Sequence, residues 1–203
     1  MADHALTTEK LTPHIGAIVH GVDLARPLDE QTFKQVHDAL IENQVIFFRD
    51  QHLTPEQQKA FGRLFGELAV HPAAPGLVEG HPEILVIHAD EKSKHVAGEN
   101  GPSDVSCDPE PPMGSILYMH ELPPVGGDTM WANMVLAFEK LPASVKQEIE
   151  GLIASHSFNS SFAAAMPLEK RLAMKAQYPD AEHPVIRTHP ETGEKILFVN
   201  AFT

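Results

Sequence analysis

Residues 99–131 read ENGPSDVSCDPEPPMGSILYMHELPPVGGDTMW, and this stretch decides the expected architecture. Its apolar runs 115–119 and 130–132 predict two short strands on either side of a turn at Gly126 and Gly127. Mixed short strands with helices packed outside them predict an α+β fold, whereas strands alone would favour a sandwich or jelly roll. The sequence around this stretch supplies the helices.

Helix signals flank the stretch on both sides. Asp29 is expected to cap a helix that ends near Asn43, with its apolar positions on one face. Thr54 is followed by Pro55 and by Gln57, a capping-box pattern, and Gly66 is a natural stop for that helix. Further helices are expected over 135–152, broken at Pro142, and over 158–178. Strands are expected over 15–20, 45–48, 84–87, 185–188 and 196–199, the last two joined as a hairpin through Gly193.

Length and charge narrow the class of protein. A chain of 203 residues fits one domain, 1–203, and the formal net charge of −13 argues against binding of nucleic acid or an anionic membrane surface. The only cysteine, Cys107, excludes an internal disulfide and is expected to be a small half-buried side chain. No leader and no run of about 18 apolar residues is visible. We therefore expect a cytoplasmic protein.

Four long blocks, in order, carry a resemblance to a known family. They read PHIGAIVHGVDLARPL (13–28), NQVIFFRDQHLTPEQQKAFGRLFGEL (43–68), SDVSCDPEPPMGSILYMHELPPVGGDTMWANM (103–134) and HPVIRTHPETGEKILFVNAFT (183–203). With these blocks the chain resembles the taurine dioxygenase-like family of Fe(II)/2-oxoglutarate-dependent dioxygenases. The resemblance implies a double-stranded β-helix, or jelly roll, with flanking helices, incomplete at the C-terminus.

The resemblance also implies roles for individual residues. Asp104 matches the carboxylate ligand of the metal, and Thr129 matches the residue whose hydroxyl bonds a carboxylate of 2-oxoglutarate. His71 matches a histidine that contacts the substrate, and Asn100 lies in the approach to the metal pair and is expected to shape the substrate pocket. Ala74 stands where a tyrosine often follows that histidine, which implies a substrate other than taurine itself.

The chain departs from the family at the metal pair. The family reads Trp-His-x-Asp, whereas this chain reads Gly101-Pro102-Ser103-Asp104, and proline has no side-chain atom that can bind a metal. The resemblance further implies a second metal histidine and an arginine for 2-oxoglutarate beyond the last block, so the chain is expected to be the N-terminal portion of the domain.

Three other histidines are candidates to replace the missing ligand. His88, His95 and His120 are the nearest in sequence, but solvated or core roles are expected for all of them, and no HxxxH or CxxC spacing marks a zinc site.

Two functions follow from these observations. The resemblance implies an enzyme that uses Fe(II), oxygen and 2-oxoglutarate to hydroxylate a small organic acid such as a sulfonate or sulfate ester. With Pro102 in the ligand position, this chain is expected to be catalytically impaired. The alternative is an inactive truncated homologue that acts as a binding or subunit-interaction module. Either reading allows a homo-oligomer, and neither expects nucleic acid or a membrane as a partner.

Overall fold

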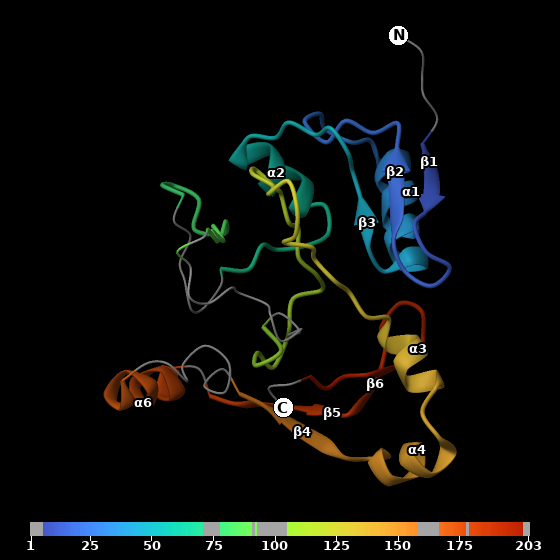
Figure 1. Ribbon diagram of the computed structural model, residues 1–203, viewed down its shortest axis with the longest axis vertical. Coiled ribbons are helices and arrows are strands. Elements are labelled where there is room, and N and C mark those ends of the chain that lie inside the picture. Colours follow the sequence, from blue (N-terminus) through green and yellow to red (C-terminus); the bar gives the residue numbers. More distant parts are fainter. Residues whose placement is uncertain are drawn as a thin grey trace. The chain divides into compact units, whose positions relative to one another are not determined.

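The structure is a computed structural model that describes residues 6–70, 78–90, 92, 105–157, 167–177 and 179–200 (Figure 1). The contacts within the chain divide it into two compact units, Met1–Ala69 and Val70–Thr203. The expectation of one domain over 1–203 remains a prediction.

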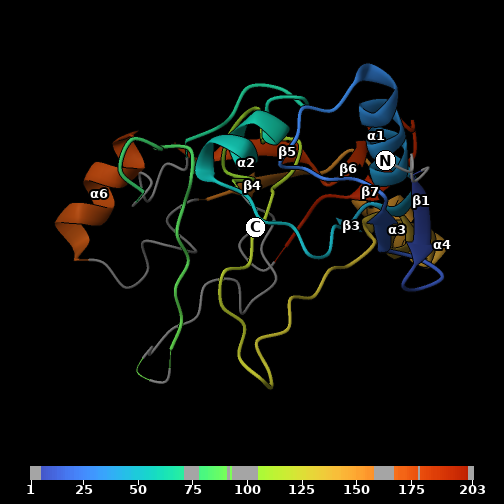
Figure 2. The ribbon, with the colours of Figure 1, turned by 90° about the horizontal axis from the view of Figure 1, so that it is seen from above.

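A three-stranded sheet and two helices build the first unit. Strand β1 (Thr7–Lys10) pairs antiparallel with β2 (Ala17–His20), and β2 pairs parallel with the short β3 (Ile46–Phe47). Helix α1 (Glu30–Asn43) packs along this sheet, as Figures 1 and 2 show from two directions, and α2 (Pro55–Gly62) follows β3. The predicted strand over 45–48 is thus present but shorter.

The core of the first unit is apolar. Leu24, Val36 and Phe61 are buried and in contact, and Phe61 meets the rings of Phe48 and Phe65 edge to face at centroid distances of 5.7 and 5.4 Å. Edge-to-face packing adds to the free energy gained by burying these rings.

Both helix starts in the first unit are capped as the sequence predicts. The Asp29 carboxylate accepts a hydrogen bond from the Thr32 amide at 2.7 Å, and this bond holds the pKa of Asp29 below its ordinary value. Thr54 and Gln57 form the reciprocal capping box at the start of α2. Helix α2 ends at Gly62, earlier than the predicted stop at Gly66, because the chain turns through Leu64 and Phe65.

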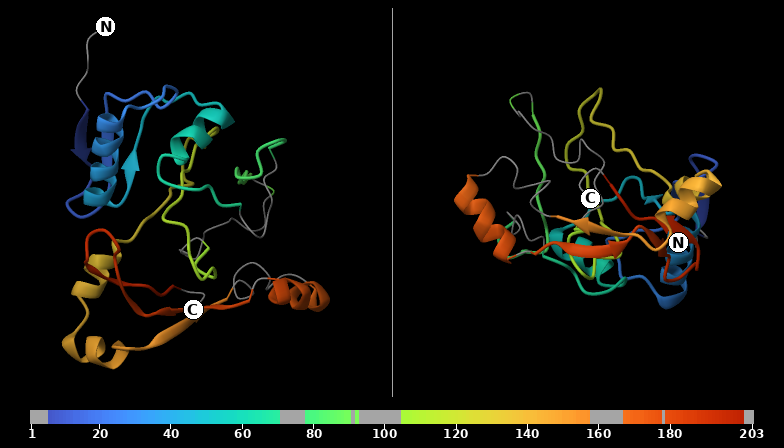
Figure 3. Two further views of the ribbon diagram at one scale, coloured as in Figure 1. Left: turned by 180° about the vertical axis from the view of Figure 1, so that it is seen from behind. Right: turned by 90° about the horizontal axis from the view of Figure 1, so that it is seen from below.

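The second unit contains paired strands with short helices. Helices α3 (Met134–Glu139) and α4 (Ala143–Ile149) are separated at Pro142, as predicted. Strand β4 (Ile153–His156) pairs antiparallel with β5 (Ala181–Pro184), and the two run side by side in both views of Figure 3. Helix α6 (Leu168–Gln177) precedes β5.

The predicted hairpin is confirmed in the second unit. Strand β6 (Ile186–Thr188) pairs with β7 (Lys195–Leu197), and Gly193 has the expected positive φ of 74°. Val185 joins β5 to β6: its amide donates to Leu152 at 2.9 Å, and its carbonyl accepts from Phe198 at 2.8 Å. One continuous stretch of chain therefore serves two ladders.

Three predicted strands are wrong in the described chain. Residues 84–87, 115–119 and 130–132 belong to none of the sheets among the described residues. Apolar runs favour an extended backbone, but a strand also needs a partner that satisfies its amides and carbonyls, and a local pattern does not specify that partner. None of the helices in the described part of the chain has the length and apolar character that a membrane span requires.

Candidate functional site

The structure describes one of the four residues that the sequence proposes for the site. Asp104, His71 and Asn100 lie outside the described residues, as do Pro102 and Ala74. Thr129 is described, so the described chain brings none of the four together.

Thr129 follows a turn that only glycine adopts with ease. Gly126 and Gly127 have φ values of 80° and 71°, and a Cβ on Gly127 would lie 3.2 Å from Cγ of Pro123. After the turn the chain runs through Thr129, which is exposed, to Trp131, which is 47% exposed. The Thr129 hydroxyl is accordingly accessible to a ligand.

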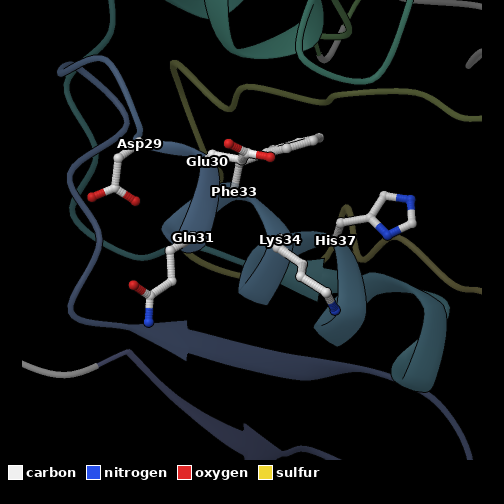
Figure 4. Close-up of a pocket in the computed structure, with 6 residues that line it drawn as sticks. All are labelled: Asp29, Glu30, Gln31, Phe33, Lys34 and His37. Atoms are coloured by element: carbon white, nitrogen blue, oxygen red, sulfur yellow. The ribbon is translucent and has the colours of Figure 1, made fainter.

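A hollow at the start of α1 has a structural explanation. Figure 4 shows the residues that line it, Asp29, Glu30, Gln31, Phe33, Lys34 and His37. The Asp29 carboxylate is already used by the helix cap, and the Phe33 ring packs edge to face on Phe65 at 5.0 Å. The Asp29 carboxylate serves the start of the helix and Lys34 pairs with Asp38, so we do not assign a catalytic role to this hollow.

A polar cluster is buried in the second unit instead. His156 is 1% exposed and His183 is 4% exposed, and their rings meet edge to face with centroids 5.0 Å apart. The ring of Phe198 stacks on His156 at 5.2 Å and meets His183 edge to face at 5.3 Å. The Arg187 guanidinium lies over the ring of Phe198, 4.4 Å from the ring centroid.

His183 connects this cluster to the segment that follows Asp104 in the sequence. Its Nε2 lies 2.9 Å from the carbonyl oxygen of Ser106 and 3.0 Å from that of Asp108. Because carbonyl oxygens only accept, Nε2 must carry the proton and donate to both. Strand β5 thus holds a segment 75–77 residues earlier in the chain.

His156 differs from His183 because, among the residues that the structure describes, neither of its ring nitrogens makes a hydrogen bond of good geometry. Burial lowers the pKa of His156 below its ordinary value, and the nearby His183 and Arg187 lower it further. His156 is therefore neutral at pH 7 and acts as an aromatic packing residue.

Cys107 sits between the two carbonyls that His183 holds. Its side chain is half-buried, which confirms the expected role, and burial raises the pKa of its thiol. A protonated thiol is a poor nucleophile and a poor metal ligand.

The described residues contain no group of three or more His, Cys, Asp or Glu side chains that could hold a metal. His88 and His120 are both exposed, so the core or edge position expected for His120 at the end of a strand is wrong; His95 lies outside the described residues. Asp108 uses a carboxylate oxygen to accept from the Glu110 amide at 2.8 Å, so it serves the local turn.

One feature of the sequence indicates that His183 is buried. Along β5 the residues alternate, with Ala181 and His183 buried and Glu182 and Pro184 exposed. Such alternation marks His183 as an inward residue of a strand. The partner carbonyls could not be identified from a local pattern.

The comparisons with known proteins point to the same family as the sequence blocks. Residues 7–203 match the family model described as "Taurine catabolism dioxygenase TauD, TfdA family". The chain is 37% identical to an alkylsulfatase of Acinetobacter baylyi (97% of this chain, 63% of the relative) and 34% identical to an alpha-ketoglutarate-dependent sulfate ester dioxygenase of Pseudomonas putida (99% and 69%).

A solved structure shares the fold as well. The crystal structure of a taurine dioxygenase from Burkholderia xenovorans is 37% identical, superposes with a TM-score of 0.77, and matches 97% of this chain and 64% of its own. The chain thus spans less than two thirds of the length of this structure and of the alkylsulfatase.

Proposed function

The chain belongs to the taurine catabolism dioxygenase TauD, TfdA family, and we propose that its chemistry is the 2-oxoglutarate-dependent oxidation of a small organic sulfate ester or sulfonate. The observation that carries this proposal is the match of residues 7–203 to the family, together with relatives named for alkyl sulfates and sulfate esters. Fe(II), oxygen and 2-oxoglutarate are the proposed cofactor and cosubstrates.

For the fold we propose a jelly roll with flanking helices, with residues 1–203 belonging to a single domain. The strand that passes through Val185 from one ladder to another supports it, because strands that switch sheets at a bend are a feature of such folds. The likeness to the taurine dioxygenase structure supports it further.

Four residues are proposed for the site. Asp104 would supply a carboxylate oxygen for the metal, and the Thr129 hydroxyl would donate a hydrogen bond to a carboxylate of 2-oxoglutarate. His71 and Asn100 would contact the substrate. Support for Thr129 comes from its exposure beside the Gly126-Gly127 turn; support for the others comes from the family blocks in which they lie.

The proposed metal pair of this chain offers a single donor. Pro102 stands in the histidine position and has no donor atom, so the proposed pair is reduced to the Asp104 carboxylate. A lone carboxylate binds a divalent transition metal weakly, because such sites rely on several ligands in fixed geometry. We therefore derive no reaction step through iron.

Metal affinity tests this proposal directly. If position 102 is the lost ligand position, the substitution Pro102→His should tighten Mn²⁺ binding, measured by the fall in the free-ion electron paramagnetic resonance signal, by about tenfold or more. The matched control is Ser103→His, which adds the same imidazole one residue away and should give no gain. Equal affinities of the two variants would contradict the assignment of the pair.

Pro102 also supports the second candidate function, an inactive homologue that binds or associates without turnover. An inactive homologue should form no succinate from 2-oxoglutarate with added Fe(II). Succinate above the level of a protein-free control would exclude the inactive homologue. Reading the coding frame around codons 102 and 203 distinguishes the two candidates at the level of the gene.

A further inference from the structure

Helix α6 has an exposed face that combines apolar and basic side chains. Leu168 and Leu172 lie one turn apart and are 68% and 61% exposed. Arg171 and Lys175 lie along the same face, because residues three, four and seven positions apart line up on a helix. We call these four residues the basic stripe. None of the described helices and strands packs along α6, and Figure 1 shows it beyond the end of β4.

A helix of this length needs a packing partner. Helix α6 has 10 residues, and an isolated helix so short is marginally stable in water, since most helical stability in proteins comes from packing of an apolar face. Its C-terminal end is fixed: Lys175 pairs with Asp180 at 3.4 Å, and Asp180 accepts a hydrogen bond from the Ser157 hydroxyl at 2.6 Å. The leucines of the basic stripe are therefore expected to pack against a surface with apolar and acidic groups.

The same unit presents such a surface around the end of α4. Glu148 and Glu150 are exposed there, and Leu152 and Ile153, which follow in the sequence, are exposed as well. We call these four residues the acidic corner. Among the described residues, no ion pair involves Glu148, Glu150 or Arg171, so these charges are available to a partner.

The pairing of β4 with β5 keeps the two surfaces apart within one copy. Strand β4 begins at the acidic corner, where Ile153 pairs with Pro184. At its other end His156 pairs with Ala181, which follows α6 in the chain. The acidic corner and the basic stripe therefore belong to opposite ends of one ladder, and Figure 1 shows α4 and α6 on either side of β4. A second copy related by a two-fold axis reverses this order and brings each stripe to the other copy's corner.

We propose that the basic stripe binds the acidic corner of a second copy of this chain, and that two such contacts make a closed homodimer. Opposite charges determine which surfaces meet, and the leucines exclude water from the contact. A two-fold arrangement makes the contact twice and leaves neither surface open for a third copy. The sequence of α6 has three basic residues and one acidic residue in a chain of net charge −13, so α6 is a cationic site on an acidic protein. The proposal does not depend on the proposed function, because it uses no residue of the candidate site.

Sedimentation velocity with charge-reversed variants tests the dimer. Arg171→Glu and Glu150→Lys each place like charges at both contacts, so each variant alone should weaken dimer formation by at least about tenfold. An equimolar mixture of the two variants should restore the dimer. In the mixed dimer one contact joins the two substituted side chains, which have opposite charges, and the other contact joins two native side chains. Lys34→Glu, which changes the net charge as Arg171→Glu does but lies on α1, is the matched control and should leave the dimer unchanged.

Three results of this experiment would overturn the proposal. The native chain could remain a monomer at about 0.1 mM, a concentration at which specific dimers form. The dimer could withstand either one of the two charge reversals, or the mixture could fail to recover it. Assemblies larger than a dimer would contradict the closed arrangement.

If a variant fails to fold, the native chain still decides. A carbodiimide joins an amine directly to a carboxylate, so Lys175 of one copy should be linked to Glu148 or Glu150 of another. Mass spectrometry of a mixture of isotope-labelled and unlabelled copies identifies which links join two copies. Links between copies that involve neither the basic stripe nor the acidic corner would exclude the proposed dimer.

Discussion

The two units of the chain bury different kinds of side chain. The first unit closes around Leu24, Val36 and Phe61, and its helix starts are capped by hydrogen bonds between residues three positions apart. The second unit buries His156 and His183, and the two hydrogen bonds of His183 join residues 75–77 positions apart. Apolar packing with local caps is encoded by short sequence patterns, whereas a buried polar cluster works only when distant segments meet.

The largest expected effect removes apolar packing from the first unit. Phe61→Ala should lower the free energy of unfolding by about 3–5 kcal/mol, because the ring is 6% exposed and contacts two other rings. Urea denaturation followed by circular dichroism measures the loss. Leu64→Ala, at a side chain that is 40% exposed, is the control and should cost much less. A similar cost for both would show that Phe61 is not a core residue.

A smaller effect, on the second unit, follows from pH. The unfolded chain protonates His156 near its ordinary pKa of 6.5, but burial lowers the pKa in the folded state. Below about pH 6.5 the unfolded state therefore binds more protons, and stability falls as pH falls until the lowered pKa is passed. Exchange of the β4 and β5 amides should accelerate between about pH 7 and pH 5, after correction for the intrinsic rate.

The matching variant for this pH effect is His156→Phe. Phenylalanine cannot be protonated and fills a similar volume, so the acid-induced loss of protection in β4 and β5 should become shallower. Unchanged pH dependence in that variant would assign the effect to another group.

Loss of a helix cap should come next in size. Thr54→Ala removes the hydroxyl that accepts from the Gln57 amide at 3.3 Å, and about 1 kcal/mol of stability should go with it. Thr54→Ser keeps an acceptor and should retain most of that stability. Thermal denaturation of the two variants side by side measures the difference, and identical values would rule out a capping role.

The smallest effect is expected on the outer face of α1. Lys34 and Asp38 form an exposed ion pair one helical turn apart, with side chains 73% and 57% exposed. Lys34→Ala should change the free energy of unfolding by less than about 0.5 kcal/mol, and added salt should reduce even that. A change above 1 kcal/mol, roughly the upper limit for exposed pairs, would show that the pair does more than surface pairing.

What the sequence predicted depends on how far apart in the chain the interacting residues lie. Helices α1 and α2 and the β6–β7 hairpin were found from caps, spacing and Gly193, which act over a few residues. The pairing of β4 with β5 and the bonds of His183 were missed, because a local pattern carries no information about partners so far away. Residues 115–119 show the converse error, since their apolar run predicted a strand that the described sheets do not include.

The candidate site was predicted through family blocks, and the proposed roles of Asp104, His71, Asn100 and Thr129 stand as predictions. The resemblance placed Pro102 in the histidine position, and chemistry identifies it as a lost donor there, because the side chain of proline has no atom that can bind a metal. A sequence therefore shows a missing donor atom in a motif more readily than it shows which distant residues contact a buried side chain.

The strand that runs through Val185 restricts how this sequence can change in length. Its two ladders share one register, so inserting or deleting a single residue at 185 would turn the inward residues of one ladder outward relative to the other. Insertions and deletions among homologues should therefore avoid 181–188 and gather in the exposed turn at 189–194, where the chain reverses and no second sheet depends on the spacing.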